Sequence, residues 1–118
     1  MSEDTLKEDQ QENQKMARNL SMAEMQKHAK EAAALLKMLS NENRLMILCT
    51  LMQGEMSVTD LNDIVPLSQS ALSQHLAALR ESNLVATRRE SQTIYYRLAG
   101  DEATQVIEVL HSIYCPEL

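Results

Sequence analysis

Uncharged hydrogen-bonding side chains are concentrated in one stretch of the chain, SQSALSQHLAALR, from Ser68 to Arg80. Its leucines recur at helical spacing, which predicts a helix with one apolar side and one side rich in serine, glutamine and histidine. Glutamine and histidine can bond to base edges, and serine is short enough to allow close approach to a base or a phosphate. The candidate nucleic-acid contacts on this helix are Ser68, Gln69, Ser70, Ser73, Gln74, His75 and Arg80.

The two cysteines, Cys49 and Cys115, are the other side chains with distinctive chemistry. Neither belongs to a CxxC pair, so a zinc finger is not predicted, and two cysteines in an intracellular chain are not by default a disulfide framework. Cys49 follows Leu48 and can serve as a small core residue, while Cys115 can be an idle thiol near a loose end. A bridge between them requires Cα atoms within about 7 Å of each other, and the sequence leaves that separation open.

The elements that must position these side chains are predicted to be mostly helical. The 118 residues include two glycines, two prolines and no phenylalanine or tryptophan, so the core must be built from aliphatic residues and methionine. Capping residues and apolar periodicity indicate helices from Ser21 to Leu39, from Glu42 to Gln53 after a cap at Ser40 or Asn41, from Ser57 to the residue before Pro66, from Ser68 to Arg80, and from Gly100-Asp101 to about Tyr114.

The period changes from helical to extended after Arg80. Two strand-like runs, Leu84–Arg89 and Thr93–Leu98, surround Glu90-Ser91-Gln92, a pattern typical of a β-hairpin. A short helix, a turn, a polar helix and a hairpin together predict a winged helix-turn-helix, mostly α with a β-hairpin wing. In a helix-turn-helix the second helix enters the major groove. The hairpin is expected to add phosphate contacts from its basic strand and its tip, which can also enter the minor groove, through Arg88, Arg89, Ser91 and Gln92.

Each candidate contact also has an ordinary structural explanation. A serine at a helix start is often only a cap, an exposed glutamine is usually solvated, and adjacent arginines on a strand are commonly plain surface. The ordered set of short helix, turn, polar helix and basic hairpin is more specific than any of its members.

Charge distribution favours a nucleic-acid partner more than the net charge of −6 does. Residues 68–98 hold four arginines and two glutamates, so one locally basic segment lies in an acidic protein. Residues 1–20 are polar and carry a net charge of −2, and we expect a disordered acidic tail there and one DNA-binding and dimerisation domain over 21–118.

The chain has no apolar run long enough to span a bilayer and no leader pattern, which predicts a cytoplasmic protein without a membrane partner.

Three segments of the chain resemble the ArsR/SmtB family of winged-helix repressors. They are LLKMLSNENRLMIL from Leu35 to Leu48, LSQSALSQHLAALRESNLV from Leu67 to Val85, and TRRESQTIYYRL from Thr87 to Leu98. The resemblance covers about residues 23–115. It implies a homodimer joined through the first and last helices that binds a palindromic operator in double-stranded DNA. Amphipathic helices at both chain ends are compatible with such a dimer, although both can instead pack on their own core.

Many members of this family sense metals, but the corresponding ligand patterns are incomplete here. The short helix SVTDLNDIV, from Ser57 to Val65, lacks the cysteines of the thiolate type. The last helix retains only Asp101 and His111 of the other type, so we expect no metal site and no cofactor.

The contexts of the two cysteines, LMILC and HSIYCP, resemble the thiol-responsive branch of the family. The resemblance implies that Cys49 and Cys115 form a redox switch, in which reactive sulfur species or oxidants produce a disulfide or polysulfide bridge and lower DNA affinity. Two alternatives remain within the family. One is a regulator without a cysteine switch that competes with a silencing protein on DNA, and the other, less favoured, is a metal sensor.

Two alternatives lie outside the family. One is a helical interaction module that never binds DNA, which unchanged mobility of promoter DNA at low salt would indicate. An enzyme is not expected, because the sequence has no glycine-rich phosphate loop, paired-carboxylate motif or nucleophile signature.

Overall fold

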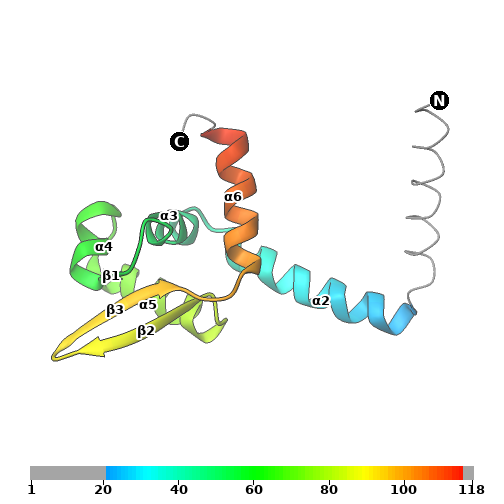
Figure 1. The fold of residues 1–118 in the computed structure, drawn as a ribbon, viewed down its shortest axis with the longest axis horizontal. Helices are drawn as coiled ribbons and strands as arrows, with labels where there is room; N and C mark the ends of the chain where they lie inside the picture. The colour runs from blue at the N-terminus through cyan, green and yellow to red at the C-terminus, as the bar shows by residue number, and fades with distance from the viewer. Residues whose placement is uncertain (1–20, 116–118) are drawn as a thin grey trace. The chain divides into compact units, whose positions relative to one another are not determined.

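The computed structural model describes residues 21–115, and the tail predicted over residues 1–20 lies outside them. Five helices and three strands follow one another in this part of the chain, as Figure 1 shows. They are α2 (Met22–Leu39), α3 (Glu42–Leu51), β1 (Met56–Ser57), α4 (Val58–Ile64), α5 (Gln69–Glu81), β2 (Val85–Glu90), β3 (Thr93–Leu98) and α6 (Glu102–Tyr114). The prediction of a mostly helical winged helix-turn-helix is confirmed.

Contacts divide the described residues into two units, with the boundary between Ala34 and Leu35. In the first unit the described residues form the larger part of α2, where almost every side chain is exposed. The second unit holds the last residues of α2 and all the other elements, including the hydrophobic core.

Side-chain caps begin α2, α3, α4 and α5 at the predicted residues, whereas α6 follows Asp101 without a side-chain cap bond. The Glu24 backbone N–H donates to Ser21 Oγ at 3.1 Å, and the Arg44 N–H donates to Asn41 Oδ1 at 3.0 Å, so Asn41 rather than Ser40 caps α3. Ser57 and Asp60 form a reciprocal capping box at the start of α4. These bonds satisfy N–H groups that have no partner within their own helix.

The core is aliphatic, and α3 lies at its centre. Ile47, Leu48 and Leu51 are the buried residues of this helix. Leu45, Cys49 and Met52 pack around the margin of the core. Apolar residues lie on more than one side of α3 because it contacts α4, α5, α6 and β3.

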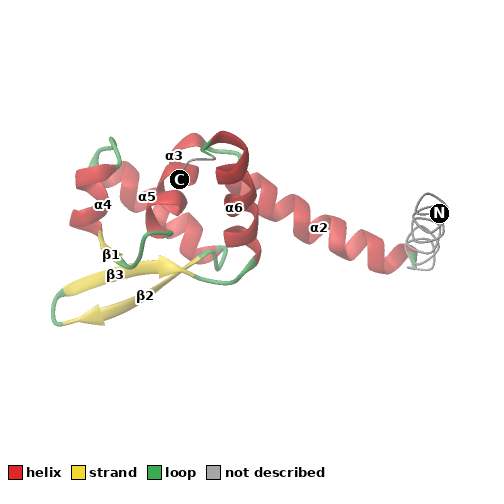
Figure 2. Cartoon of the chain, turned by 45° about the horizontal axis from the view of Figure 1, so that its top comes forward, coloured by secondary structure: helices red, strands yellow, loops and turns green. Residues whose placement is uncertain are grey.

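The strands form one antiparallel sheet in the order β1-β3-β2. The hairpin pairs Val85 with Leu98 at its base and Glu90 with Thr93 at its tip, close to the predicted strand limits. Figure 2 shows this hairpin projecting from the helices as the wing. Strand β1 was not predicted, because its two residues are too few to give an alternating pattern.

Candidate nucleic-acid interface

The turn between α4 and α5 is fixed by a side chain that the sequence analysis did not single out. Asn62 Nδ2 donates to the backbone oxygen of Leu67 at 2.7 Å, and the Leu67 N–H donates to the Val65 oxygen at 2.8 Å. Asparagine is a common turn residue, but nothing in the sequence identifies which carbonyl it bonds to. These contacts fix the turn that leads from α4 into α5.

Helix α5 presents the polar face that the sequence predicted. Leu72, Leu76 and Leu79 have no exposed surface, and they anchor the helix in the core. The opposite side carries the exposed candidates Gln69, Ser70, Ser73, Gln74 and Arg80, whereas His75 is half-buried. The helix therefore has the arrangement that a reading helix needs, with rigid leucines behind and hydrogen-bonding groups in front.

Ser68 has a structural task at the start of this helix. Its Oγ accepts a hydrogen bond from the Ala71 N–H at 3.2 Å and lies 3.4 Å from Ser70 Oγ. The interpretation of Ser68 as a helix cap is confirmed. A cap and a phosphate contact are compatible, because a hydroxyl can accept one bond and donate another.

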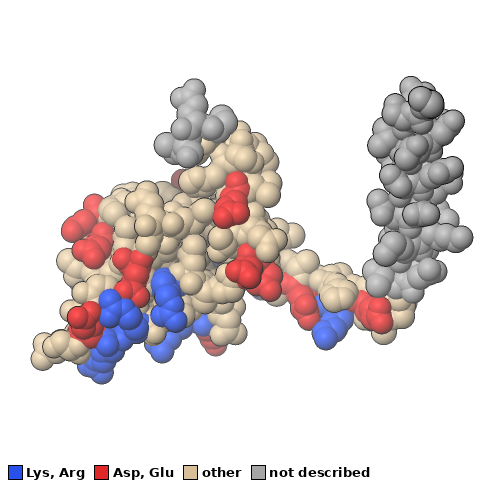
Figure 3. Space-filling model, in the orientation of Figure 1, with Lys and Arg blue, Asp and Glu red and all other residues tan. Residues whose placement is uncertain are grey.

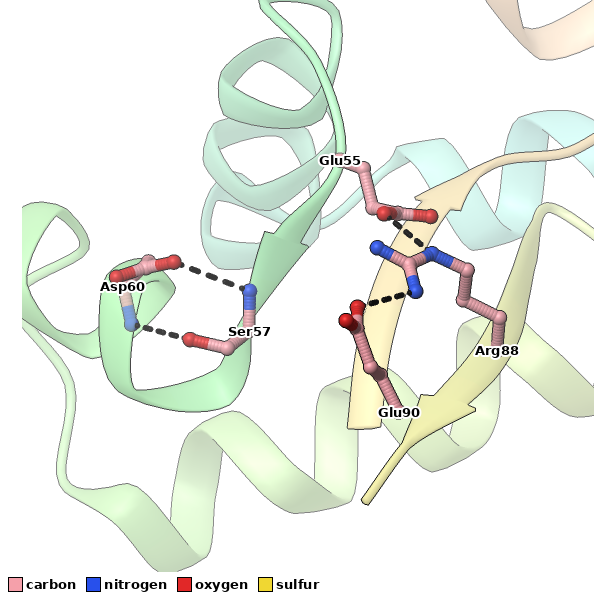
Figure 4. A network of polar contacts seen from close by, with 5 residues as sticks. All are labelled: Glu55, Ser57, Asp60, Arg88 and Glu90. Carbon is pink, nitrogen blue, oxygen red and sulfur yellow. Dashed lines mark hydrogen bonds and ion pairs between the residues drawn. The ribbon is translucent and has the colours of Figure 1, made fainter. Parts of the chain in front are cut away.

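The wing holds its two arginines differently. Arg88 Nε donates to Glu55 Oε1 at 2.6 Å, and one terminal nitrogen donates to Glu90 Oε2 at 2.8 Å (Figure 4). Glu90 and then Glu55 raise the pKa of Arg88 above its usual value. Arg89 Nε instead donates to the backbone oxygen of Ser91 at 3.3 Å. Ser91 and Gln92 are exposed at the tip, where Ser91 adopts a left-handed φ of 57°.

The basic side chains lie on the expected part of the molecule. Figure 3 shows arginine side chains gathered over the wing and α5, with a few carboxylates beside them. Such a mixed surface can orient a protein on a polyanion while limiting nonspecific affinity.

The two cysteines line a single cavity of about 660 Å³. It lies between α3, the end of α4 and the end of α6, and its walls include Leu45, Met46 and His111. Both cysteines are free and half-buried. Burial raises the pKa of Cys49, and the nearby Cys115 raises it further. The sequence identified the two residues but gave no sign that they share a cavity.

In residues 21–115, no cluster of three or more histidine, cysteine, aspartate or glutamate side chains is arranged to hold a metal ion. None of the helices in that range is long and apolar enough to cross a membrane.

A family model described as bacterial regulatory protein, arsR family, matches residues 41–87, from the cap of α3 into β2. The chain is 50% identical over 96 residues to the transcriptional activator HlyU of Vibrio cholerae, which covers 81% of this chain and 89% of that protein. The chain belongs to the arsR family. This result confirms the resemblance seen in the sequence, and the arsR-family chain is accordingly a DNA-binding transcriptional regulator and not an enzyme.

Other relatives agree with this assignment. The biofilm growth-associated repressor of Agrobacterium fabrum is 50% identical over 91 residues, which are 77% of this chain and 78% of the relative. The structure of reduced HlyU from Vibrio cholerae superposes with a TM-score of 0.75 at 51% identity, covering 80% of this chain and 99% of that one. The arsR-family fold is thus shared along nearly the whole length of that relative.

Proposed function

We propose that this arsR-family protein is an operator-specific regulator whose DNA affinity is controlled by a thiol switch made of Cys49 and Cys115. The observation that carries the proposal is their shared cavity, which brings two free, half-buried thiols from opposite ends of the domain sequence to one place. One similar structure is that of reduced HlyU from Vibrio cholerae, and a reduced, DNA-binding form of this chain would correspond to it.

DNA recognition rests on α5 and the wing. Gln69 and Gln74 are exposed on α5 and suited to adenine edges, and the serines beside them permit close approach. The remaining proposed contacts are Ser68, Ser70, Ser73, His75, Arg80, Arg89, Ser91 and Gln92, and Arg88 lies beside them on the wing.

A homodimer would give the regulator two reading helices. Helix α6 exposes Val109, Ile113 and Tyr114, and α2 exposes Met22 and Met25, which is more apolar surface than a monomeric helix usually leaves in water. Two-fold pairing through these helices would set two half-sites roughly 34 Å apart, and it therefore requires a palindromic operator.

The switch chemistry follows from the environments of the two thiols. Burial raises the pKa of Cys49, which lowers its fraction of reactive thiolate, and we therefore assign the first attack to Cys115. Its thiolate attacks the outer sulfur of a hydropersulfide, and a thiolate leaves. Cys49 then loses its proton to solvent and attacks the Cys115 sulfur, forming the disulfide and releasing hydrosulfide. An oxidant that converts Cys115 to a sulfenic acid leads to the same disulfide with loss of water.

A bridge between the two cysteines would affect DNA binding by way of α3. A bridge would tie the end of α6 to α3, and α3 packs directly against both α4 and α5. A shift of α3 can therefore alter the angle of α5. In a dimer joined through α6, the same shift alters the spacing of the two α5 helices.

The test is fluorescence anisotropy with the DNA upstream of the protein's own gene, measured first with a reductant and then after a persulfide donor. Tight binding that weakens after treatment supports the switch. Unchanged DNA affinity after the donor would rule out the thiol switch. It would favour the second candidate, a regulator that acts by competing with a silencing protein. That candidate is supported by the presence of both an activator and a repressor among the similar proteins.

A further inference from the structure

Adjacent arginines of the wing lie on opposite faces of the sheet. Residues paired across antiparallel strands share a face, and successive residues alternate. Arg88 pairs with Tyr95, whereas Arg89 pairs with Ile94. The face of Arg89 also carries Val85, Tyr96 and Leu98, which are buried in the core or packed against it.

The face of Arg89 is therefore the one directed toward α5. Val85 belongs to the same core cluster as Leu76 and Leu79 of that helix, and β2 contacts α5. Arg89 is exposed on this face. Of the two arginines, Arg89 is therefore the one on the side of the sheet that faces α5.

Arg88 lies on the other face and spans the whole sheet. Glu55 directly precedes β1, and β3 separates β1 from β2. The Arg88 side chain therefore crosses β3 to reach Glu55, with its guanidinium carbon 4.5 Å from the centre of the Tyr95 ring. Glu90 holds the guanidinium from the wing side. The contact joins the segment before α4 to the middle of the wing, across 33 positions of sequence.

The charge of Arg88 is already met by carboxylates. Two glutamates within 2.8 Å face one guanidinium, so the group as a whole is negative. A phosphate approaching the Arg88 guanidinium is repelled by the second carboxylate, or must displace a charge-assisted bond.

We propose that Arg88 is a positioning residue that fixes the wing relative to the helix-turn-helix, and that Arg89 makes the wing's phosphate contact. The inference rests on the proposed binding of DNA by α5 and the wing. It divides a pair of arginines that the sequence treats as equivalent.

The experiment compares Arg88→Gln and Arg89→Gln in the full chain, with Lys37→Gln as a control for loss of one positive charge. The probe is a fluorescein-labelled duplex selected from a random pool by the unaltered protein. Each phosphate contact contributes about 0.9 to the slope of log affinity against log salt concentration. Arg89→Gln should lower that slope by about 0.9 per wing, and Arg88→Gln and Lys37→Gln should leave it unchanged. An equal fall for Arg88→Gln would overturn the proposal.

Hydrogen exchange of the wing tests the positioning role without DNA. Arg88→Gln and Glu55→Ala should both speed amide exchange in β2 and β3, while Arg89→Gln should not. Glu55→Ala keeps every basic residue, so this variant can replace Arg88→Gln in the exchange test if Arg88→Gln folds poorly. Unchanged exchange in Glu55→Ala, or a steeper salt slope for that variant, would show instead that Arg88 is a restrained phosphate ligand. Failure of the unaltered protein to select any duplex would count against DNA binding itself, and the exchange result would still decide the role of Arg88.

Discussion

Cys49 and Cys115, which are 66 positions apart in the sequence, lie in the wall of one cavity between α3 and the end of α6. Cys49 belongs to α3, which packs on α4 and α5, and Cys115 directly follows α6, which has an exposed apolar face. A covalent bond between them would couple the proposed dimer surface to the proposed DNA surface.

Replacing Cys115 should separate binding from response. Cys115→Ser removes the first nucleophile and leaves the core intact, so we expect unchanged affinity for the operator duplex under reducing conditions and no release by a persulfide donor. Anisotropy titrations with and without donor measure both. Ser112→Ala is the matched control, because Ser112 is exposed one turn earlier on α6 and should not affect release. Normal release by Cys115→Ser would exclude the switch.

The raised pKa of Cys49 should appear in the pH dependence of stability. Between the ordinary thiol pKa, 9.0, and the raised one, the folded state holds a proton that the unfolded state has lost. The free energy of unfolding must then fall as pH rises through this window. Urea denaturation from pH 7 to 10 in reductant should show a steeper fall for the unaltered chain than for Cys49→Ser. Parallel curves would mean that burial does not perturb this thiol.

The exposed glutamines of α5 should contribute to specificity and not to folding. Gln74→Ala should weaken binding to the selected operator by about 1–3 kcal/mol, the usual value of a good bidentate base contact. Its melting temperature and its affinity for a random duplex should be unchanged. Gln105→Ala, which removes an exposed glutamine from α6, is the control. Equal losses on both duplexes would assign Gln74 to the phosphate backbone.

The capping box of α4 should have a measurable effect on stability. Ser57 is 8% exposed and bonds reciprocally with Asp60, so Ser57→Ala should lower the free energy of unfolding by about 1 kcal/mol. The exposed Ser73 makes a suitable comparison, since Ser73→Ala should change stability little. Similar denaturation midpoints for the two variants would argue that the cap is dispensable.

The apolar face of α6 should carry self-association. Ile113 is 60% exposed, and Ile113→Asp would place a charge in the proposed interface. Sedimentation velocity should report a dimer for the unaltered protein and a monomer for this variant. Ile94→Asp, at a residue 41% exposed on the wing, should remain dimeric. A monomeric unaltered protein would exclude the dimer.

Local signals in the sequence predicted most of the fold. Caps such as Ser57 with Asp60, and the regular leucines of α5, act within a few residues and therefore leave a readable pattern. Contacts between segments that are distant in the sequence left no such pattern. The two-residue strand β1, the bond from Asn62 to Leu67 and the reach of Arg88 to Glu55 all depend on segments meeting in space.

The candidate site followed the same division. The polar face of α5 and both cysteines were identified from residue type and spacing, but the cavity shared by the cysteines could not be. The alternation that separates Arg88 from Arg89 is implicit in a strand, yet it gains meaning only once the positions of Glu55 and α5 are known.

The most direct test of the central claim is the operator affinity of the bridged protein itself. The chain is treated with a persulfide donor, the species with Cys49 joined to Cys115 is isolated and verified by peptide mass mapping, and its dissociation constant is compared with that of the reduced form. We predict at least tenfold weaker binding for the bridged species and full recovery after reduction. Equal affinities for the bridged and reduced forms would contradict the switch.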